Sequence, residues 1–378
     1  MRITVLGTGL VGSAIVEDLC REKDFELTAV DRNPRALQAL NLPIKTVTAD
    51  LQTTPVADVV AGAELVVCAV PGCMGFKTLE GVIQAGKNVV DISFFPEDAF
   101  QLDALAKEHD VCAVVDCGVA PGLCNLIAGH VSSLLDEVER YTCYVGGLPR
   151  VRRWPYEYKA VFSPADVLEE YTRPARVVEH GRLVVKEALS EVELLDFPEV
   201  GTLEAFNTDG LRSLLDTLEA PFMVEKTLRY PGHANLMRAF RESGFFGADP
   251  VQLGEQTVRP VELTSKLLFE QWKLERGEED ITVFRVIMDG KKAGKPCRYT
   301  YDLLDHYDPT TDTASMSRTT GYTCAIVARM LAGGLFAQRG VCPPEFVGKT
   351  PGCFEHLRAQ YAKRHIGLQQ TVIGLDDA

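Results

Sequence analysis

The chain lacks any apolar run long enough to cross a membrane, and it lacks an excess of positive charge. No stretch of its 378 residues reaches the roughly 20 apolar residues of a membrane-spanning helix. Acidic residues outnumber basic ones, 53 to 39, so the formal net charge is −14. A surface of that sign repels the phosphates of nucleic acids and of anionic lipids. We therefore expect no nucleic-acid or membrane partner, and a small molecule as the ligand.

Signatures of metal binding and of nucleophilic catalysis are also missing. The seven histidines are scattered, none of the eleven cysteines falls in a Cys-x-x-Cys pair, and no Gly-x-Ser-x-Gly sequence occurs. The cysteines are spread over stretches that read as strands and helices, among them Cys68, Cys112 and Cys324. We therefore expect free, buried thiols in a reducing cytoplasm, not a disulfide framework or a metal site.

What the sequence does contain is a nucleotide-binding pattern at its start. An apolar run at 2–6, suited to a buried strand, is followed by Gly7, Gly9 and Gly12 at the spacing Gly-x-Gly-x-x-Gly. Gly7 permits a tight turn, Gly9 lets the backbone approach a diphosphate, and Gly12 lets the next helix pack closely on the strand. That spacing alone is weak support, because glycines are common in turns. The strand, the helix and an acid that follows make it strong.

The helix that begins at Leu10 and Val11 turns its unpaired N–H groups toward the expected diphosphate. A second apolar run at 25–30 ends at Asp31, whose carboxylate can accept hydrogen bonds from the adenosine ribose and would repel a 2′-phosphate. This acid predicts NAD as the cofactor. Arg32 beside it can stack on adenine or admit some NADP, so NADP remains possible.

The first 115 residues alternate between apolar runs and helical stretches. Six strand candidates occur in all, and the last four span 42–47, 65–70, 88–92 and 111–115. Alternation of this kind predicts an α/β fold with a Rossmann-type, doubly wound parallel sheet.

Ligands of such sheets lie beyond the carboxyl ends of the strands. The positions there add to the glycine motif as candidate cofactor-binding residues: Asp50, Leu51, Val70, Pro71, Ser93, Gly118 and Pro121. Asp50 can equally be a turn or helix-cap residue. Asp116 lies at the same rim and is a candidate proton acceptor, or else another cap.

Beyond residue 123 the composition shifts. The stretch 148–158 is rich in proline, arginine and aromatic residues, and reads either as a solvated loop or as a lid over the substrate. Further on we expect a hairpin at 180–181, a helix from about 209, a strand at 281–288 closed by a turn at 289–290, and an apolar helix at 322–335. The last 40 residues or so read as mixed and helical.

Long motifs in this second part resemble the saccharopine dehydrogenase family, and the chain looks most like its lysine 6-dehydrogenases. The resemblance covers nearly the whole length. It rests on the sequences DCGVAPGLCNL (116–126), YVGGLP (144–149), YK-x-x-FSP-x-x-x-x-EEYTRPA (158–175), EAFNTDGLRSLL (204–215), KTLRYPGH (226–233), SRTTGYT (317–323) and RGVCPPE (339–345).

The resemblance implies a cofactor domain built from residues 1–123 and about 315–378. An α+β domain for substrate binding and dimerisation, about 124–314, is inserted between them. It further implies a homodimer and NAD-dependent oxidation of an amino-acid amine. The lysine ε-amino group becomes an imine, water releases ammonia, and the aldehyde cyclises. Relatives instead condense an amine and an aldehyde reductively, to saccharopine or carboxynorspermidine. A regulator that binds NAD without turnover is a distant alternative.

Such chemistry needs a proton acceptor, because an ammonium with a pKa near 10.4 cannot yield hydride until it is neutral. Asp116, Lys159 and His233 are the candidates, and none is preferred. Each can also have a structural role: a cap, an exposed lysine, a buried hydrogen-bonding histidine. The candidate substrate-binding residues are Tyr158, Arg173, Arg229, Arg318 and Thr319. Arg318 can clamp a carboxylate with two hydrogen bonds or make an ion pair between domains.

Overall fold

The computed structural model describes residues 1–160, 164–275 and 277–375. The chain forms two compact units. Unit 1 consists of 1–133 and 317–366, and unit 2 of 134–316 and 367–378. The first boundary falls ten residues after the expected one, and residues 367–378 belong to unit 2, not to the cofactor domain.

Unit 1 is built on a parallel sheet, and the expected Rossmann-type order is confirmed. All of its strand pairs run parallel. Along the sheet they are β3 (Lys45–Thr48), β2 (Glu26–Asp31), β1 (Arg2–Leu6), β4 (Leu65–Cys68), β5 (Asn88–Asp91), β6 (Cys112–Val114) and β17 (Gly340–Cys342). The order changes direction at β1, so the loop after β1 lies where such sheets bind nucleotides.

Helices cover this sheet. They are α1 (Leu10–Leu19), α2 (Pro34–Ala39), α3 (Val56–Val60), α4 (Gly72–Gln84), η1 (Ala99–Leu102), α5 (Asp103–Glu108), α6 (Leu123–Ser132), α11 (Ser315–Ala332), α12 (Pro344–Lys349) and α13 (Cys353–Lys363). Apolar residues of α3, α4 and α5 form one core with strand residues such as Leu6, Val66 and Val89. These strands are apolar throughout because both of their faces are buried.

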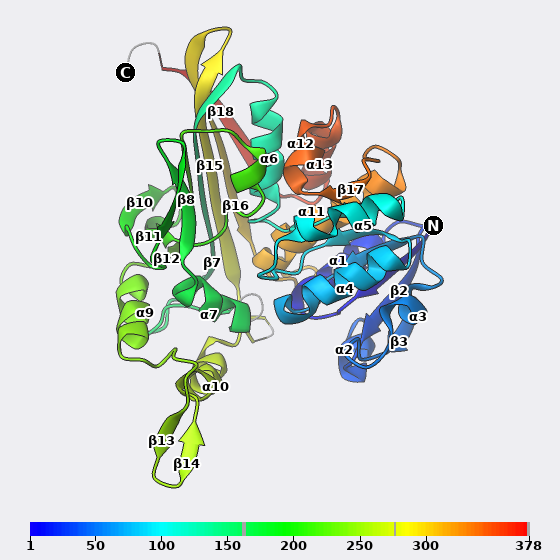
Figure 1. The fold of residues 1–378 in the computed structure, drawn as a ribbon, viewed down its shortest axis with the longest axis horizontal. Helices are drawn as coiled ribbons and strands as arrows, with labels where there is room; N and C mark the ends of the chain where they lie inside the picture. Colours follow the sequence, from blue (N-terminus) through cyan, green and yellow to red (C-terminus); the bar gives the residue numbers. More distant parts are fainter. Residues whose placement is uncertain (161–163, 276, 376–378) are drawn as a thin grey trace. The chain divides into compact units, whose positions relative to one another are not determined.

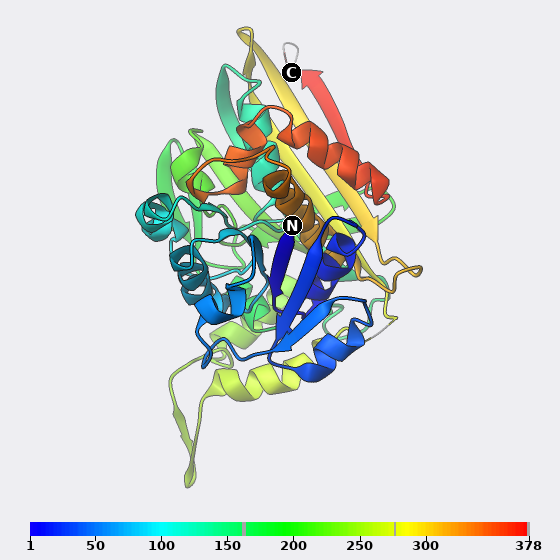
Figure 2. The same ribbon diagram turned by 90° about the vertical axis from the view of Figure 1, so that its right-hand side faces the viewer.

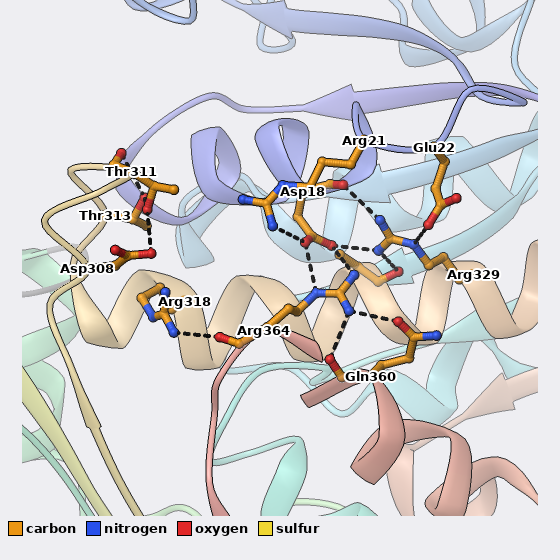
Figure 3. A network of polar contacts seen from close by, with 11 residues as sticks. Asp18, Arg21, Glu22, Asp308, Thr311, Thr313, Arg318, Arg329, Gln360 and Arg364 are labelled. Atoms are coloured by element: carbon orange, nitrogen blue, oxygen red, sulfur yellow. Dashed lines mark hydrogen bonds and ion pairs between the residues drawn. The ribbon is translucent and has the colours of Figure 1, made fainter. Parts of the chain in front are cut away.

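A buried carboxylate ties the C-terminal helices to the nucleotide-binding motif. Figure 3 shows Asp18 of α1 between Arg329 of α11 and Arg364 at the end of α13. The Oδ2 atom of Asp18 lies 2.6 Å from Nη1 of Arg329, and Oδ1 lies 2.8 Å from Nε of Arg364. Asp18 is fully buried. Residues more than 300 positions apart in sequence therefore belong to one folding unit.

Unit 2 is built on a mixed sheet, whose long strands are seen in Figure 1. In order they are β10 (Glu193–Phe197), β11 (Gly201–Asn207), β12 (Phe222–Arg229), β7 (Glu137–Pro149), β15 (Asp280–Lys292), β16 (Lys295–His306) and β18 (Leu368–Gly374), with β8 (Ala175–Glu179) paired to β12 and β9 (Arg182–Lys186) to β8. A separate ribbon contains β13 (Val251–Leu253) and β14 (Gln256–Val258). The helices are α7 (Pro164–Thr172), α8 (Leu214–Thr217), α9 (His233–Glu242) and α10 (Pro260–Trp272).

The expected turn at Asp289 and Gly290 is wrong. β15 continues through these residues to Lys292, with a bulge between them, and the hairpin turns at Ala293 and Gly294. A side chain at Gly290 would lie 2.2 Å from the carbonyl oxygen of Glu137 on β7. The glycine is therefore needed for close strand contact, which the dipeptide Asp-Gly does not reveal.

Two further expectations need correction. The helix expected from about 209 is the short α8, which begins at Leu214. The apolar helix expected at 322–335 is α11, which begins at Ser315 and therefore includes the SRTTGYT motif. The C-terminal residues, expected to be mixed and helical, contain β17 of the first sheet and β18 of the second in addition to helices. The hairpin expected at 180–181 is present between β8 and β9.

Candidate functional site

The glycine motif of unit 1 has the geometry of a diphosphate-binding turn. Gly7 has φ +91°, and a Cβ there would lie 2.4 Å from the carbonyl oxygen of Ala69. A Cβ on Gly12 would lie 2.2 Å from the carbonyl oxygen of Gly7. Gly9, the N-cap of α1, differs: its Cβ would meet nothing within 4 Å. Two glycines are thus required by the fold, and the third leaves open space beside a helix N-terminus.

Leu10 and Val11 begin α1 directly after this turn, as expected. Leu10 is 50% exposed, so the entrance to the helix is open to solvent. The backbone N–H groups of a first helical turn have no partner within the helix and favour anions. A diphosphate fits this place.

Asp31 connects the end of β2 to the glycine turn. Its Oδ2 accepts hydrogen bonds from the Thr8 backbone N–H (2.8 Å) and from the Thr8 hydroxyl (3.0 Å). Its Oδ1 accepts one from the N–H of Asn33 (2.8 Å). A carboxylate has about four acceptor positions, so one position on Oδ1 is left for a ribose hydroxyl. Arg32 is exposed beside it.

The remaining positions of the rim mostly have local structural contacts. Asp50 accepts a hydrogen bond from the Gln52 N–H (3.0 Å), which is the turn role given above as the alternative, and Leu51 packs on the core. Val70 is buried, and Pro71 is the exposed N-cap of α4. These residues therefore lie near the C-terminal ends of the strands, and most of them already make contacts within unit 1.

Ser93 points away from solvent toward a carboxylate that the sequence did not single out. Its N–H and its hydroxyl donate to the two oxygens of Asp91, at 2.9 and 3.0 Å. Asp91 is fully buried, and burial raises its pKa to about 7, with the nearby Asp116 adding to the effect. Asp116 is buried and has a left-handed backbone, φ +52°. The carboxyl groups of Asp91 and Asp116 therefore lie at the C-terminal ends of the neighbouring strands β5 and β6.

The DCGVAPG motif forms a tight loop that opens α6. Gly118 donates its N–H to the carbonyl oxygen of Pro121 (3.0 Å), and the carbonyl oxygen of Gly118 accepts from Leu123 (2.9 Å). A Cβ on Gly118 would lie 3.1 Å from the side chain of Thr320 on α11. Two motifs 200 residues apart in sequence therefore touch within unit 1.

Arg318 and Thr319 lie on α11, where both make contacts within unit 1. Arg318 donates to the carbonyl oxygen of Arg364 (2.9 Å), and its guanidinium lies 5.6 Å from the ring centre of Tyr322. Thr319 is fully buried, and its carbonyl oxygen accepts from the Thr323 hydroxyl (2.6 Å). These contacts give both residues a structural role.

In unit 2, three of the predicted residues come together in one buried cluster. The guanidinium of Arg229 lies 4.5 Å from the ring centre of Tyr158, and the rings of Tyr158 and His233 are 5.3 Å apart. Arg229 also binds the carboxylate of Glu170 at 2.6 Å. The rings of Tyr171 and Trp272 complete the cluster. Arg229 is thus already paired, and Tyr158 packs in the core, where burial raises the pKa of its hydroxyl.

His233 uses both ring nitrogens. Nδ1 lies 3.0 Å from the carbonyl oxygen of Tyr156, which can only accept, so Nδ1 carries the hydrogen. Nε2 therefore accepts from the hydroxyl of Tyr171, 2.9 Å away. Burial lowers the pKa of His233 to about 3, with the Arg229 charge adding to the effect. A histidine held neutral in this way does not take up a proton at neutral pH, which disfavours His233 as the proton acceptor.

Lys159 and Arg173 are paired as well. The ammonium of Lys159 donates to the carbonyl oxygen of Lys273 (2.8 Å) and lies 3.2 Å from Glu278. Arg173 binds Glu169 one turn away on α7, at 3.1 Å. Residues 161–163 of the same motif lie outside the described residues. Neither basic residue is thus an uncommitted clamp.

Comparison with known proteins identifies the family of this chain. Residues 3–114 match the model of the saccharopine dehydrogenase NADP binding domain, and residues 118–366 match that of the saccharopine dehydrogenase C-terminal domain. The chain belongs to the saccharopine dehydrogenase family.

Curated members of this family are similar over part of their length. The mitochondrial alpha-aminoadipic semialdehyde synthase of Mus musculus is 24% identical over 66% of this chain and 29% of that protein. The saccharopine dehydrogenase [NADP(+), L-glutamate-forming] of Saccharomyces cerevisiae is 24% identical over 68% of this chain and 61% of that protein. The chain therefore spans less than two thirds of the length of these relatives.

A solved structure shares the fold along the whole chain. Apo saccharopine dehydrogenase (L-Glu forming) from Saccharomyces cerevisiae superposes with a TM-score of 0.81 at 17% identity, over 98% of this chain and 99% of that one. Together with the family match, this likeness confirms the α/β fold with a Rossmann-type sheet and a nicotinamide dinucleotide as the cofactor class.

Several residues of the family motifs act in ways that sequence reasoning missed. Glu204, the first residue of EAFNTDGL, accepts from the backbone N–H groups of Gly232 (2.8 Å) and Ala234, and so caps α9 at the RYPGH turn. Asp209 of the same motif binds Arg176 with two hydrogen bonds, at 2.8 and 2.9 Å. Glu204 and Asp209 could have been identified because they are acidic residues inside the family motifs. A buried carboxylate needs hydrogen-bond donors, so such a residue predicts donors nearby.

Within the described residues, no helix is both long and apolar enough to span a membrane, and no group of three or more His, Cys, Asp or Glu side chains is placed to hold a metal ion. All eleven cysteines are free thiols, and all except Cys20 and Cys73 are buried.

Proposed function

We propose that this chain is a NAD-dependent oxidoreductase acting on the carbon–nitrogen bond of an amino acid, and that it is an L-lysine 6-dehydrogenase. The reaction converts the ε-amino group to an imine, which water hydrolyses to ammonia and allysine. Allysine then cyclises to piperideine-6-carboxylate. The observation that carries the proposal is the nucleotide turn with an acceptor position free on Asp31, in a chain whose residues 3–114 and 118–366 match the two domain models of this family.

The residues of unit 1 fit the cofactor. When bound, a nicotinamide dinucleotide supplies the hydride acceptor. The backbone N–H groups at the start of α1 would hold its diphosphate, in the open space beside Gly9. Asp31 would hold the adenosine ribose by the remaining position on Oδ1. A 2′-phosphate would meet the charge of this carboxylate, so we propose NAD over NADP, although the matched domain model is named for NADP.

We propose that Asp116 accepts the proton of the substrate amine. Asp116 follows β6 at the carboxyl edge of the sheet, where ligands of this fold bind. The variant Asp116→Asn tests this assignment. We expect kcat to fall by about 100-fold or more at neutral pH and NAD affinity to stay within about threefold. An unchanged kcat contradicts the assignment.

A second candidate is the saccharopine or carboxynorspermidine reaction, in which an amine and an aldehyde are joined reductively. The name of the Saccharomyces cerevisiae relative, a saccharopine dehydrogenase, favours it, and so does the arginine-rich stretch 148–158, which suits a substrate with two carboxylates. The structure weakens the second argument, because Arg150, Arg152 and Arg153 pair with Glu279, Glu157 and Glu278.

A substrate panel separates these reactions. NADH formation from L-lysine alone supports lysine 6-dehydrogenase. NADH formation from saccharopine but not from lysine, or NADH consumption only when amine and aldehyde are both present, supports the second candidate. Binding of NAD without turnover of any amino donor leaves a NAD-sensing protein that is not an enzyme.

The cofactor preference has its own test. Removal of the carboxylate in Asp31→Ala should lower the ratio of kcat/KM for NAD over NADP by about tenfold or more, because the repulsion of the 2′-phosphate is lost. Arg32→Ala is the matched control next to it, and should lower the use of NADP only. An unchanged ratio in Asp31→Ala rejects the role of the acid.

A further inference from the structure

The loop that carries Asp116 is held by an asparagine of its own motif. Asn125, at the third position of α6, is fully buried. Its Oδ1 accepts a hydrogen bond from the backbone N–H of Gly122, at 3.1 Å, and Gly122 in turn pairs with Gly118 in the loop. An amide group that uses its oxygen in this way has its Nδ2 atom left as a donor. The orientation of the Asn125 side chain is therefore fixed by the loop.

Glu345 of α12 binds the other end of this amide group. Its Oε2 accepts from Nδ2 of Asn125, at 3.0 Å. The helices α6 and α12 lie side by side in both views (Figure 1 and Figure 2). A Cβ on Gly129 of α6 would lie 2.0 Å from the carbonyl oxygen of Glu345, so the two backbones touch. A contact this close fixes the position of Glu345 relative to Asn125.

The loop itself needs contacts that hold its backbone. Asp116 has φ +52°, and Gly122 has φ +136°. A residue other than glycine keeps a left-handed backbone only where its surroundings fix it, and such residues are common at functional sites. At the strand end of the loop, the N–H of Cys117 donates to the carbonyl oxygen of Asp91, at 2.9 Å. The sheet therefore holds one end of the loop, and Asn125 holds the other.

Helix capping alone explains Asn125 but not Glu345. One side-chain oxygen is enough to satisfy an N–H at the start of a helix. Glu345 adds a carboxylate that is only 1% exposed. Burial of a carboxylate costs free energy, and apolar side chains of similar size often join two helices equally well. A buried acid at the end of a chain of hydrogen bonds is suited to fixing an orientation.

We propose that Asn125 and Glu345 are positioning residues for Asp116. Glu345 fixes the amide group of Asn125, and Asn125 fixes the Gly122 end of the loop. Displacement of a reacting group by about 1 Å can lower a rate by about 100-fold. Because Asp116 is the proton acceptor of the proposed function, the role of Asn125 and Glu345 in catalysis rests on that function.

The variant Asn125→Ala, which removes both hydrogen bonds, tests this role. We expect kcat to fall by about tenfold or more with L-lysine or saccharopine, whichever the wild type turns over. The Kd for NAD, which depends chiefly on the glycine turn and Asp31, should stay within about threefold. A loss confined to kcat separates positioning from a general loss of structure.

Asn88→Ala is the matched control. Asn88 accepts from the N–H of Cys112, at 2.8 Å, and so joins β5 to β6 at the opposite ends of the same two strands. Its loss should lower the thermal unfolding midpoint, as the loss of Asn125 does, but leave kcat unchanged. Equal losses of kcat in the two variants would overturn the proposal.

Exchange of the donor and the acceptor provides a rescue. In Asn125→Asp/Glu345→Gln, a carboxylate at position 125 still accepts from Gly122, and an amide group at position 345 donates to it. We expect this double variant to keep kcat within about threefold of the wild type. Glu345→Ala alone should lower kcat by about tenfold, because Nδ2 of Asn125 is left buried without its acceptor. A double variant no more active than Glu345→Ala would contradict the proposal.

Hydrogen exchange tests the contact without turnover, and it also serves if Asn125→Ala does not fold. In Glu345→Ala the amide hydrogen of Gly122 should exchange about tenfold faster or more than in the wild type, whereas Asn88→Ala should leave its exchange unchanged. Unchanged exchange in Glu345→Ala, or wild-type kcat in Asn125→Ala, overturns the proposal. The proposed function fails in a different way, through a wild-type chain that turns over no amino donor.

Discussion

Gly9 and Gly12 lie in one turn of unit 1, yet a side chain would meet opposite surroundings at the two positions. At Gly9, with φ −69°, a Cβ meets nothing, whereas at Gly12 it meets backbone at 2.2 Å. We therefore expect Gly9→Val to fold with a nearly unchanged thermal midpoint but to lose NAD binding by about 100-fold or more, because the valine occupies the place of the diphosphate. Gly12→Val should not fold stably.

Calorimetric titration with NAD and thermal unfolding measure these two effects separately. Wild-type affinity in Gly9→Val would mean that the dinucleotide binds elsewhere. A stable Gly12→Val would mean that α1 does not pack on β1 as closely as described.

His233 is a residue for which the sequence left two interpretations open. In the RYPGH motif it was a candidate proton acceptor or a buried hydrogen-bonding histidine, and its contacts to Tyr156 and Tyr171 favour the structural role. We expect His233→Phe to lower the free energy of unfolding by about 2–4 kcal/mol, since it leaves a buried carbonyl and a buried hydroxyl without their partner. His233→Asn, which can still donate near Nδ1, should lose less.

Urea unfolding ranks these variants, and the pH profile of kcat/KM separates the two roles. With a pKa of about 3, His233 stays neutral throughout the assay range, so the profile of His233→Asn should keep the wild-type shape. The loss of one limb of the profile would restore the catalytic interpretation.

At the scale of the secondary-structure elements, the packing of α11 and α13 on α1 depends on the carboxylate of Asp18. Asp18 is fully buried between two guanidinium groups that are themselves about nine-tenths buried. Its replacement in Asp18→Asn leaves the buried charge of Arg364 without this carboxylate and leaves Arg329 with Glu22, at 3.0 Å, as its carboxylate partner. We expect the free energy of unfolding to fall by about 3–5 kcal/mol, measured by urea unfolding.

Asp110→Asn is the matched control for this element. Asp110 makes an exposed ion pair with Arg339 at 2.8 Å, and asparagine tolerates its left-handed backbone. Loss of this ion pair should lower the free energy of unfolding by less than about 1 kcal/mol. Equal effects at the two sites would mean that Asp18 does not hold the C-terminal helices on α1.

At the scale of the whole molecule, buried carboxyl groups in both units make stability depend on pH. Burial raises the pKa of Asp91 to about 7 and that of Glu225 to about 8, and it raises the pKa of Asp280 to about 6. In the unfolded chain these groups ionise near pH 4, so between pH 4 and pH 8 the folded state holds more protons than the unfolded one. The contribution of these three groups to the free energy of unfolding should therefore fall as the pH rises through this window, whereas His233, whose pKa burial lowers to about 3, contributes in the opposite sense below about pH 6.5.

The variant Asp91→Asn isolates one contribution. In this variant the decline in the free energy of unfolding between pH 4 and pH 7 should be smaller by up to about 4 kcal/mol. Glu225→Gln should likewise reduce the decline, up to pH 8. The control Glu108→Gln, at an exposed position, should leave the curve unchanged. A pH dependence in Asp91→Asn that is the same as in the wild type would contradict the raised pKa of this buried carboxyl group.

The sequence by itself determined the parallel sheet of unit 1 and its nucleotide turn. Both depend on local patterns: apolar runs for buried strands, glycines where backbone must approach, and an acid at the end of the second strand. The family motifs were likewise legible as sequence. The side-chain pairs within those motifs were not, because Glu204 and Gly232, or Asp31 and Thr8, become neighbours only when separate strands meet.

Tertiary structure alone decided which polar residues are already in use. Arg229, His233 and Lys159 have the residue types of a substrate site, yet each is bound to a partner from another segment, and no local pattern encodes that partner. The same holds for Gly290, which reads as a turn until β7 lies against it. A short pattern specifies the conformation of its own residues, whereas the occupation of a donor or an acceptor depends on contacts between residues far apart in the chain.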